Sequence, residues 1–236
     1  GRVLAISAHA VGWPIARRGS QSIANALASY LESLGGQIVT GSRVRSLEEL
    51  KDSSLILFDI TPRQLLEISG DTLRPSYRRK LERYQYGCGA FKMDWALREP
   101  IPWKAEECRL AATVHVGGGM DDIVESEAAA WQQETSAKPF LLVVQPTLFD
   151  TTRAPQGKHT AWAYCHVPHG STEDRTTFIE AQIERFAPGF QEQILARSVL
   201  PPAALEQYDA NLIGGDINAG ALTLKQLAWR PTRSLY

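Results

Sequence analysis

Alternating hydrophobic and polar positions in the middle of the chain predict β-strands that bury one face. In FKMDWAL the predicted buried face carries Phe91, Met93, Trp95 and Leu97, and the other face carries Lys92, Asp94 and Ala96. In RLAATVHV the same alternation places Leu110, Ala112, Val114 and Val116 opposite Arg109, Ala111, Thr113 and His115. Strands with one polar face are typical of antiparallel sheets that leave that face open.

Two further strands and two helices are predicted beyond this pair. The segments FLLVVQ and HTAWAYCHV predict strands at residues 140–145 and 159–167, and residues 121–133 are expected to form a helix. Ser171 or Thr172 is predicted to cap a second helix that ends at Pro188-Gly189. The inner side of that helix would carry Phe178, Ile179, Ile183 and Phe186.

The first 70 residues combine a helix with three segments typical of strands. Ser20 would cap the helix and Gly35-Gly36 would end it, with its apolar positions at Ile23, Leu27, Leu31 and Leu34. QIVT at 37–40, RVRSL at 43–47 and LILFDI at 55–60 indicate strands, and Pro62 is expected to begin a helix. This order predicts an α/β layer ahead of the antiparallel sheet.

Composition and charge indicate an ordinary globular protein. The chain has 236 residues, of which 44 % are hydrophobic and 22 % charged, and its net charge is -1. A balance so close to neutral argues against a nucleic-acid partner. The chain contains no run of 18 apolar residues, which predicts a cytoplasmic protein, with peripheral contact to a membrane left open.

The cysteines and histidines do not predict a metal site or a nucleophile. The three cysteines lack C-x-x-C spacing and are expected to be reduced thiols. On an extended strand His159 and Cys165 would lie about 20 Å apart, and His166 with His169 would supply only two ligands. Cys165 and His166 are adjacent on a predicted strand, so they would point to opposite faces and could not pair.

Two features could meet a ligand. Lys92 and Asp94 share a polar sheet face, which is either part of a ligand site or a solvated face with cross-strand ion pairs, and the pattern alone favours the solvated face. The turn GGD at 214–216 precedes a short predicted helix and is the candidate anion site, although it lacks the G-x-G-x-x-G order.

Five segments in order resemble the phytoene dehydrogenase-related family of FAD-dependent oxidoreductases, which includes carotenoid desaturases and retinol saturase. They are FKMDWALREPIPW, AATVHVGGGMDDI, PFLLVVQPTLFDTTRAPQGKHTAWAYCHVPHGS, IEAQIERFAPGF and NLIGGDINAGALTLKQL. The resemblance implies a mixed α+β fold, with a partial FAD/NAD(P)-binding-type layer and an inserted substrate lobe on a largely antiparallel sheet. The implied division is a partial FAD-binding lobe at 1–70, a substrate-binding lobe at 71–205 and a return to the FAD-binding lobe at 206–236.

The resemblance also implies site residues. Val44, Gly214, Gly215 and Asp216 would contact FAD, and Lys92, Asp94, Trp95, His115 and His166 would line the substrate cavity. No catalytic residue is identified. The substrate would be a hydrophobic small molecule of the polyisoprenoid kind.

The sequence departs from the family in the segment that binds the FAD pyrophosphate. The sequence has no G-x-G-x-x-G segment of the kind that seats the FAD pyrophosphate, so it is expected to be a middle-to-late fragment of the family's length. It would then need an FAD-binding segment or a second chain, and would bind FAD weakly or not at all alone. The alternative is a substrate-binding or interaction module without catalysis.

Overall fold

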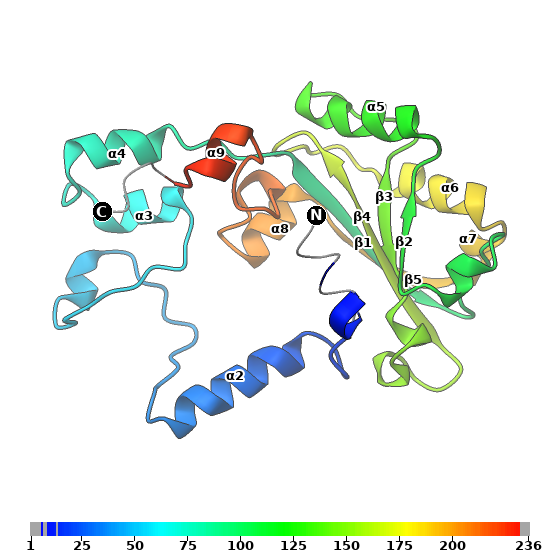
Figure 1. The fold of residues 1–236 in the computed structure, drawn as a ribbon, viewed down its shortest axis with the longest axis horizontal. Helices are drawn as coiled ribbons and strands as arrows, with labels where there is room; N and C mark the ends of the chain where they lie inside the picture. The colour runs from blue at the N-terminus through cyan, green and yellow to red at the C-terminus, as the bar shows by residue number, and fades with distance from the viewer. Residues whose placement is uncertain (1–5, 7–8, 13, 232–236) are drawn as a thin grey trace.

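The computed structural model describes residues 6, 9–12 and 14–231. Five strands form one sheet in the order β2-β3-β4-β1-β5, and all neighbours are antiparallel (Figure 1). The strands are β1 (Gly89–Leu97), β2 (Thr113–Val116), β3 (Leu141–Val144), β4 (His159–Val167) and β5 (Ile194–Leu200). The expected mixed α/β class with a largely antiparallel sheet is confirmed.

One face of this sheet forms the hydrophobic core. The alternation predicted in β1 is observed, because Phe91, Met93, Trp95 and Leu97 are each at most 2 % exposed. Figure 1 shows α6 (Thr176–Phe186) and α7 (Phe190–Gln193) on this side of the sheet. Burial of the core side chains contributes about 25 cal/mol per Å² of apolar surface and fixes which face of each strand points outward.

Some details around the sheet differ from the sequence expectation. Leu110 is 77 % exposed, because residues Glu107–Leu110 form a 3-10 helix and β2 begins only at Thr113. Helix α6 begins at Thr176 with Arg175 at its N-cap, so neither Ser171 nor Thr172 caps it. Strand β5 and helix α8 (Pro202–Tyr208) were not predicted.

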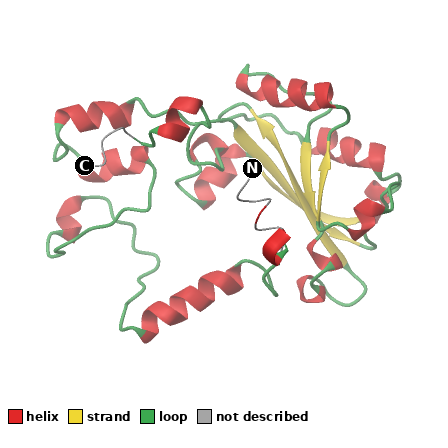
Figure 2. Cartoon of the chain, in the orientation of Figure 1, coloured by secondary structure: helices red, strands yellow, loops and turns green. Residues whose placement is uncertain are grey.

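The first part of the chain is built from helices and loops (Figure 2). The expected helix is present as α2 (Gln21–Ser33), followed by the 3-10 helix η1 (Leu47–Leu50), α3 (Pro62–Ser69) and α4 (Pro75–Glu82). The strands expected at 37–40, 43–47 and 55–60 are not formed. A strand needs a neighbouring backbone to pair with, and no described strand pairs with these segments, whose Val39, Leu55 and Leu57 are each at least 74 % exposed.

The tail packs back against the first part of the chain. It contains α8, the 3-10 helix η5 (Ile213–Gly215) and α9 (Leu224–Ala228). The Thr61 N–H donates to Asn211 Oδ1 at 2.9 Å, and Arg63 forms an ion pair with Glu206. The division at residues 70 and 205, with a tail that returns to an FAD-binding lobe, stays a prediction.

In the part of the chain that the structure describes, no helix combines the length and the apolar character needed to cross a membrane.

Candidate functional site

The open face of the sheet carries a row of aromatic and charged side chains. Trp162, Tyr164 and His166 alternate on β4 with the buried Ala161, Ala163 and Cys165. The register pairs Tyr164 with Lys92 and Trp162 with Asp94 on the neighbouring strand β1. These five side chains therefore occupy one continuous surface on the two central strands, opposite the apolar core.

Neighbouring aromatic rings contact one another along this surface. The ring centroids of Trp162 and Tyr164 lie 6.5 Å apart with an interplanar angle of 15°, and Tyr164 meets His166 edge to face at 5.6 Å. Lys92 Nζ lies 5.6 Å from the centroid of the Trp162 ring and also forms an ion pair with Asp94. The paired charges cancel locally, so the surface offers aromatic area to a ligand without a strong net charge.

A cavity of about 390 Å³ adjoins the His166 end of this surface. It is lined by Gly87, Cys88, Glu127, Trp131, His166, Asp216, Asn218, Gly220, Leu222 and Thr223. His166 Nδ1 lies 2.7 Å from Glu127 Oε2 of α5 (Met120–Trp131), so the carboxylate orients the imidazole. The cavity thus joins polar groups on one wall to the apolar side chains of Trp131 and Leu222.

The thiols near this site are poor nucleophiles. Burial, followed by the Glu127 and Asp216 carboxylates, raises the pKa of Cys88 to about 11. Burial also raises the pKa of Cys165 to about 12, and Cys165 lies on the core face, away from His166 as expected. Burial and Glu127 raise the pKa of the Tyr164 hydroxyl as well. All three groups are therefore protonated near neutral pH, and a thiolate mechanism is not supported.

Two predicted cavity residues lie elsewhere. Trp95 is 2 % exposed on the core face, where its Nε1–H donates to Glu180 Oε1 at 3.0 Å and its ring meets Phe190 edge to face. The alternation on β1 places Trp95 on the face opposite Lys92 and Asp94, and a role for Trp95 in a substrate cavity stays a prediction. His115 is on the open face but on the edge strand β2, which β3 and β4 separate from β1, and its ring contacts Phe140.

Three residues of this surface and of the cavity beside it, Trp162, Tyr164 and Glu127, were not selected from the sequence. Trp162 and Tyr164 carried a usable signal, because they stand two and four positions before His166 in a strand pattern. Glu127 carried none, because its contact with His166 joins a helix to a strand across 39 positions in sequence.

The turn predicted to contact FAD has a structural role in the described residues. The N–H of Gly214 donates to Glu206 Oε2 at 2.7 Å, that of Gly215 to Leu212 O, and that of Asp216 to Ile213 O. The buried Asp216 carboxylate accepts from the N–H groups of Gly87 at 2.6 Å and Asn218 at 2.9 Å. These donors do not fit a phosphate cradle, because none of the three N–H groups is free.

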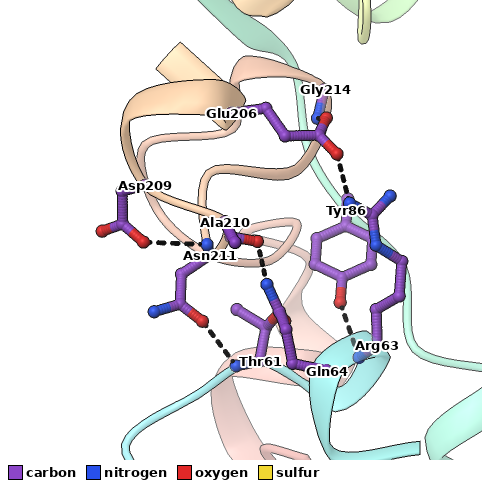
Figure 3. A network of polar contacts seen from close by, with 9 residues as sticks. All are labelled: Thr61, Arg63, Gln64, Tyr86, Glu206, Asp209, Ala210, Asn211 and Gly214. Carbon is purple, nitrogen blue, oxygen red and sulfur yellow. Dashed lines mark hydrogen bonds and ion pairs between the residues drawn. The ribbon is translucent and has the colours of Figure 1, made fainter. Parts of the chain in front are cut away.

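Val44, the other predicted cofactor contact, lies far along the chain from that turn. It lines a broad cavity of about 930 Å³ together with residues of the 43–60 segment, α3 and the end of α8. Three of its lining residues, Gln64, Ala210 and Asn211, belong to the polar network shown in Figure 3. In it Gln64 donates to Ala210 O, and the Asn211 N–H donates to Asp209 Oδ1 at 2.9 Å. Contact of Val44 with a cofactor stays a prediction.

Among the described residues there is no group of three or more histidine, cysteine, aspartate or glutamate side chains placed to hold a metal ion.

Comparisons with known proteins connect the chain to oxidoreductases. No family model matches it. The chain is similar to the pyridine nucleotide-disulfide oxidoreductase domain-containing protein 2 of Mus musculus, with 33 % identity over 39 % of this chain and 18 % of that protein. The Rattus norvegicus protein of the same name matches at the same identity and coverage. The chain thus aligns with about 18 % of the length of these curated relatives.

Two solved structures align with much of this chain. An oxidoreductase from Methanosarcina mazei gives a TM-score of 0.49 at 17 % identity, covering 78 % of this chain and 42 % of that one. A Pyrococcus furiosus protein gives 0.46 at 16 % identity, covering 78 % and 43 %. The broader part of the expected resemblance, likeness to oxidoreductases, is supported by the curated relatives, whose names do not mention phytoene.

Proposed function

We propose that this chain supplies the substrate-facing sheet of a flavin-dependent oxidoreductase that dehydrogenates or saturates a hydrophobic, polyisoprenoid-like substrate. The observation that carries the proposal is the open sheet face, on which Trp162, Tyr164 and His166 stand in a row above an apolar core. The named oxidoreductase relatives support the reaction class. The five ordered segments described above support the narrower family.

The open face has properties that suit an elongated apolar ligand. Trp162 and Tyr164 are partly exposed and nearly parallel, so they offer a flat surface against which a long unsaturated chain can lie. From Trp162 to His166 the strand advances about 13 Å, at about 3.3 Å per residue. The ligand would be positioned by contact with this surface, while the flavin supplies the electron transfer when bound.

The flavin would be held mainly by an N-terminal FAD-binding segment that this sequence does not contain, or by a second chain. The N–H groups of the 214–216 turn are already used, and the sequence lacks a G-x-G-x-x-G segment. We therefore assign no proton transfer to a residue of this chain, and we expect the isolated chain to bind FAD weakly or not at all.

A non-catalytic substrate-binding or interaction module is the second candidate. The observation that favours it is the 214–216 turn, whose three N–H groups are already hydrogen-bonded within the protein and are not free for a phosphate. Such a module would use the same open face to bind a hydrophobe, but it would never acquire a flavin.

Bound flavin distinguishes the two candidates. The chain would be purified alone and also co-expressed with any G-x-G-x-x-G segment encoded beside it, and flavin absorbance would be measured in both samples. The oxidoreductase proposal expects flavin only in the co-expressed sample, and anaerobic bleaching of that flavin by polyisoprenoid alcohols or hydrocarbons. Failure to gain flavin favours the module.

Two substitutions then test the open face. Trp162→Ala is expected to weaken substrate binding about tenfold and leave flavin absorbance unchanged, because the aromatic contact with the ligand is lost. Phe149→Ala is the matched control, because Phe149 is 54 % exposed and lies outside the sheet. Equal substrate affinity in Trp162→Ala and Phe149→Ala would rule out the open face as the substrate site.

A further inference from the structure

A further cavity, separate from the open sheet face, is lined by cations that have no partner among the described residues. It measures about 650 Å³ and lies between α4 and α9, which Figure 1 shows next to each other. Its charged lining residues are Lys80 and Arg83 at the end of α4, and Lys225 of α9. Among the described residues that line it there is no carboxylate side chain.

The polar groups that shape this cavity are already satisfied, which leaves the cations for a ligand. The buried Gln226 accepts from the Gln85 N–H at 2.9 Å and donates to Gln85 O at 2.9 Å. The Tyr84 hydroxyl donates to Ala219 O at 2.8 Å and accepts from Arg230 Nε at 2.9 Å. By contrast, Lys80, Arg83 and Lys225 have no side-chain hydrogen bond or ion pair with any described residue.

Helix electrostatics explain only part of this arrangement. Cations at the C-terminal end of a helix interact favourably with its dipole, which accounts for Lys80 and Arg83 on α4. The same reasoning does not explain why a distant segment brings Lys225 to the same cavity, since three like charges around one space repel each other. An anionic ligand would remove that cost.

We propose that this cavity binds a phosphorylated ligand with an aromatic ring, of the nucleotide kind. The three cations would contact the phosphate oxygens, and the aromatic walls formed by Tyr84 and Trp229 would flank the ring. A volume of about 650 Å³ suits such a molecule, because ligand cavities commonly measure about 300–1,000 Å³. The inference goes beyond the proposed function, because no residue of the open face lines this cavity.

Calorimetric titration of the purified protein with ADP, pyrophosphate and adenosine tests the proposal. Salt of about 0.15 M would screen loose surface attraction, since the Debye length is then about 8 Å. ADP is expected to bind saturably and more tightly than either pyrophosphate or adenosine. No saturable ADP binding would overturn the site, and equal affinity for pyrophosphate would overturn the aromatic part.

Matched variants locate the binding. Lys225→Gln and Arg83→Gln are each expected to weaken ADP binding about tenfold, because each removes a charge-assisted contact, and Lys225→Arg is expected to retain it. Arg79→Gln is the control, because Arg79 belongs to the same helix but does not line the cavity. A loss in Arg79→Gln equal to that in Lys225→Gln would show non-specific attraction and overturn the site.

FAD also contains an ADP portion. A competition experiment therefore distinguishes a cavity that binds a separate nucleotide from one that binds the ADP portion of FAD. In a flavin-loaded sample, ADP is expected to bind with unchanged affinity and without releasing flavin. Displacement of flavin by ADP would place the cofactor's own diphosphate in this cavity and overturn the second ligand. Absence of flavin altogether contradicts the proposed function without affecting the ADP titration.

Discussion

At the scale of single residues, Gly214 meets a strict steric requirement. Its φ is 61°, and a Cβ at this position would collide with the His169 ring. That ring is held by Tyr86, on which it stacks at 6.3 Å, and by Gly87 O, 2.9 Å from His169 Nδ1. We expect Gly214→Ala to lower the free energy of unfolding by about 2–5 kcal/mol, from backbone strain and overpacking together, measured by urea denaturation.

Gly157→Ala separates these two causes. Gly157 has a φ of 70° and no atom within 4 Å of its would-be Cβ, so only the backbone strain of about 1–2 kcal/mol applies. A loss in Gly214→Ala no larger than that in Gly157→Ala would contradict the contact with His169.

The same turn shows what residue identity could and could not predict. Glycines at 214 and 215 indicated a turn, and the turn is present with φ angles of 61° and 81°, which glycine adopts without strain. Their use as an anion site depends on whether the N–H groups are free, and that is decided by Glu206, Leu212 and Ile213. For Trp95 the residue pattern was the better guide. The alternation assigned it to the core face, and only the family resemblance suggested the cavity.

At the scale of elements, strands were predicted correctly where the hydrophobic pattern of a segment reflects the burial of its two faces. Strands β1 and β4 alternate because each has one buried and one open face. Residues 55–60 have an equally apolar sequence, but a strand also requires a neighbour, and a single segment does not reveal whether one is present. Strand β5 was not predicted, because its central residues are exposed and do not alternate between buried and exposed positions.

One carboxylate of α6 links this helix to two strands of the sheet, in addition to the apolar contacts of Ile179 and Ile183. Glu180 Oε1 accepts from Trp95 Nε1 at 3.0 Å and pairs with Arg197 Nε at 2.9 Å. We expect Glu180→Leu to cost about 1–3 kcal/mol of unfolding free energy, because it leaves the buried indole N–H without an acceptor. Glu180→Gln keeps an acceptor and should cost about 1 kcal/mol or less, since the Arg197 side chain is 47 % exposed.

Unfolding followed by tryptophan fluorescence would measure both Glu180 variants. If Glu180→Leu and Glu180→Gln lost equal amounts of unfolding free energy, the charge of Glu180, and not its role as acceptor for Trp95, would be what stabilises α6 on the sheet.

At the scale of the whole molecule, a small polar network joins the first part of the chain to the tail. Glu206 is central to it, because its carboxylate pairs with Arg63 of α3 and accepts from the Gly214 N–H at 2.7 Å (Figure 3). The Arg63 N–H also donates to the Tyr86 hydroxyl at 3.2 Å, just before β1. The open face, the 214–216 turn and α3 are thus connected through residues that no local pattern identifies.

This network should weaken in acid. The Gly214 N–H, and then Arg63, hold the pKa of Glu206 below its ordinary value of 4.5. Because the pKa is lower in the folded state than in the unfolded state, the stabilisation is present above pH 4.5 and is lost as the pH falls through the folded value. We therefore expect the wild-type protein to lose more unfolding free energy than Glu206→Gln between about pH 7 and about pH 3.

Urea denaturation of both proteins across this range measures the difference, because other titrating groups contribute equally and cancel in the comparison. Glu125→Gln serves as the control, since Glu125 is exposed on α5 and has no side-chain partner among the described residues. Hydrogen exchange would locate the effect, with amides of α3 expected to lose protection in acid before those of β4, because Glu206 connects α3 to the rest. Parallel loss of stability in wild type and Glu206→Gln would show that the two parts of the chain are joined by other contacts.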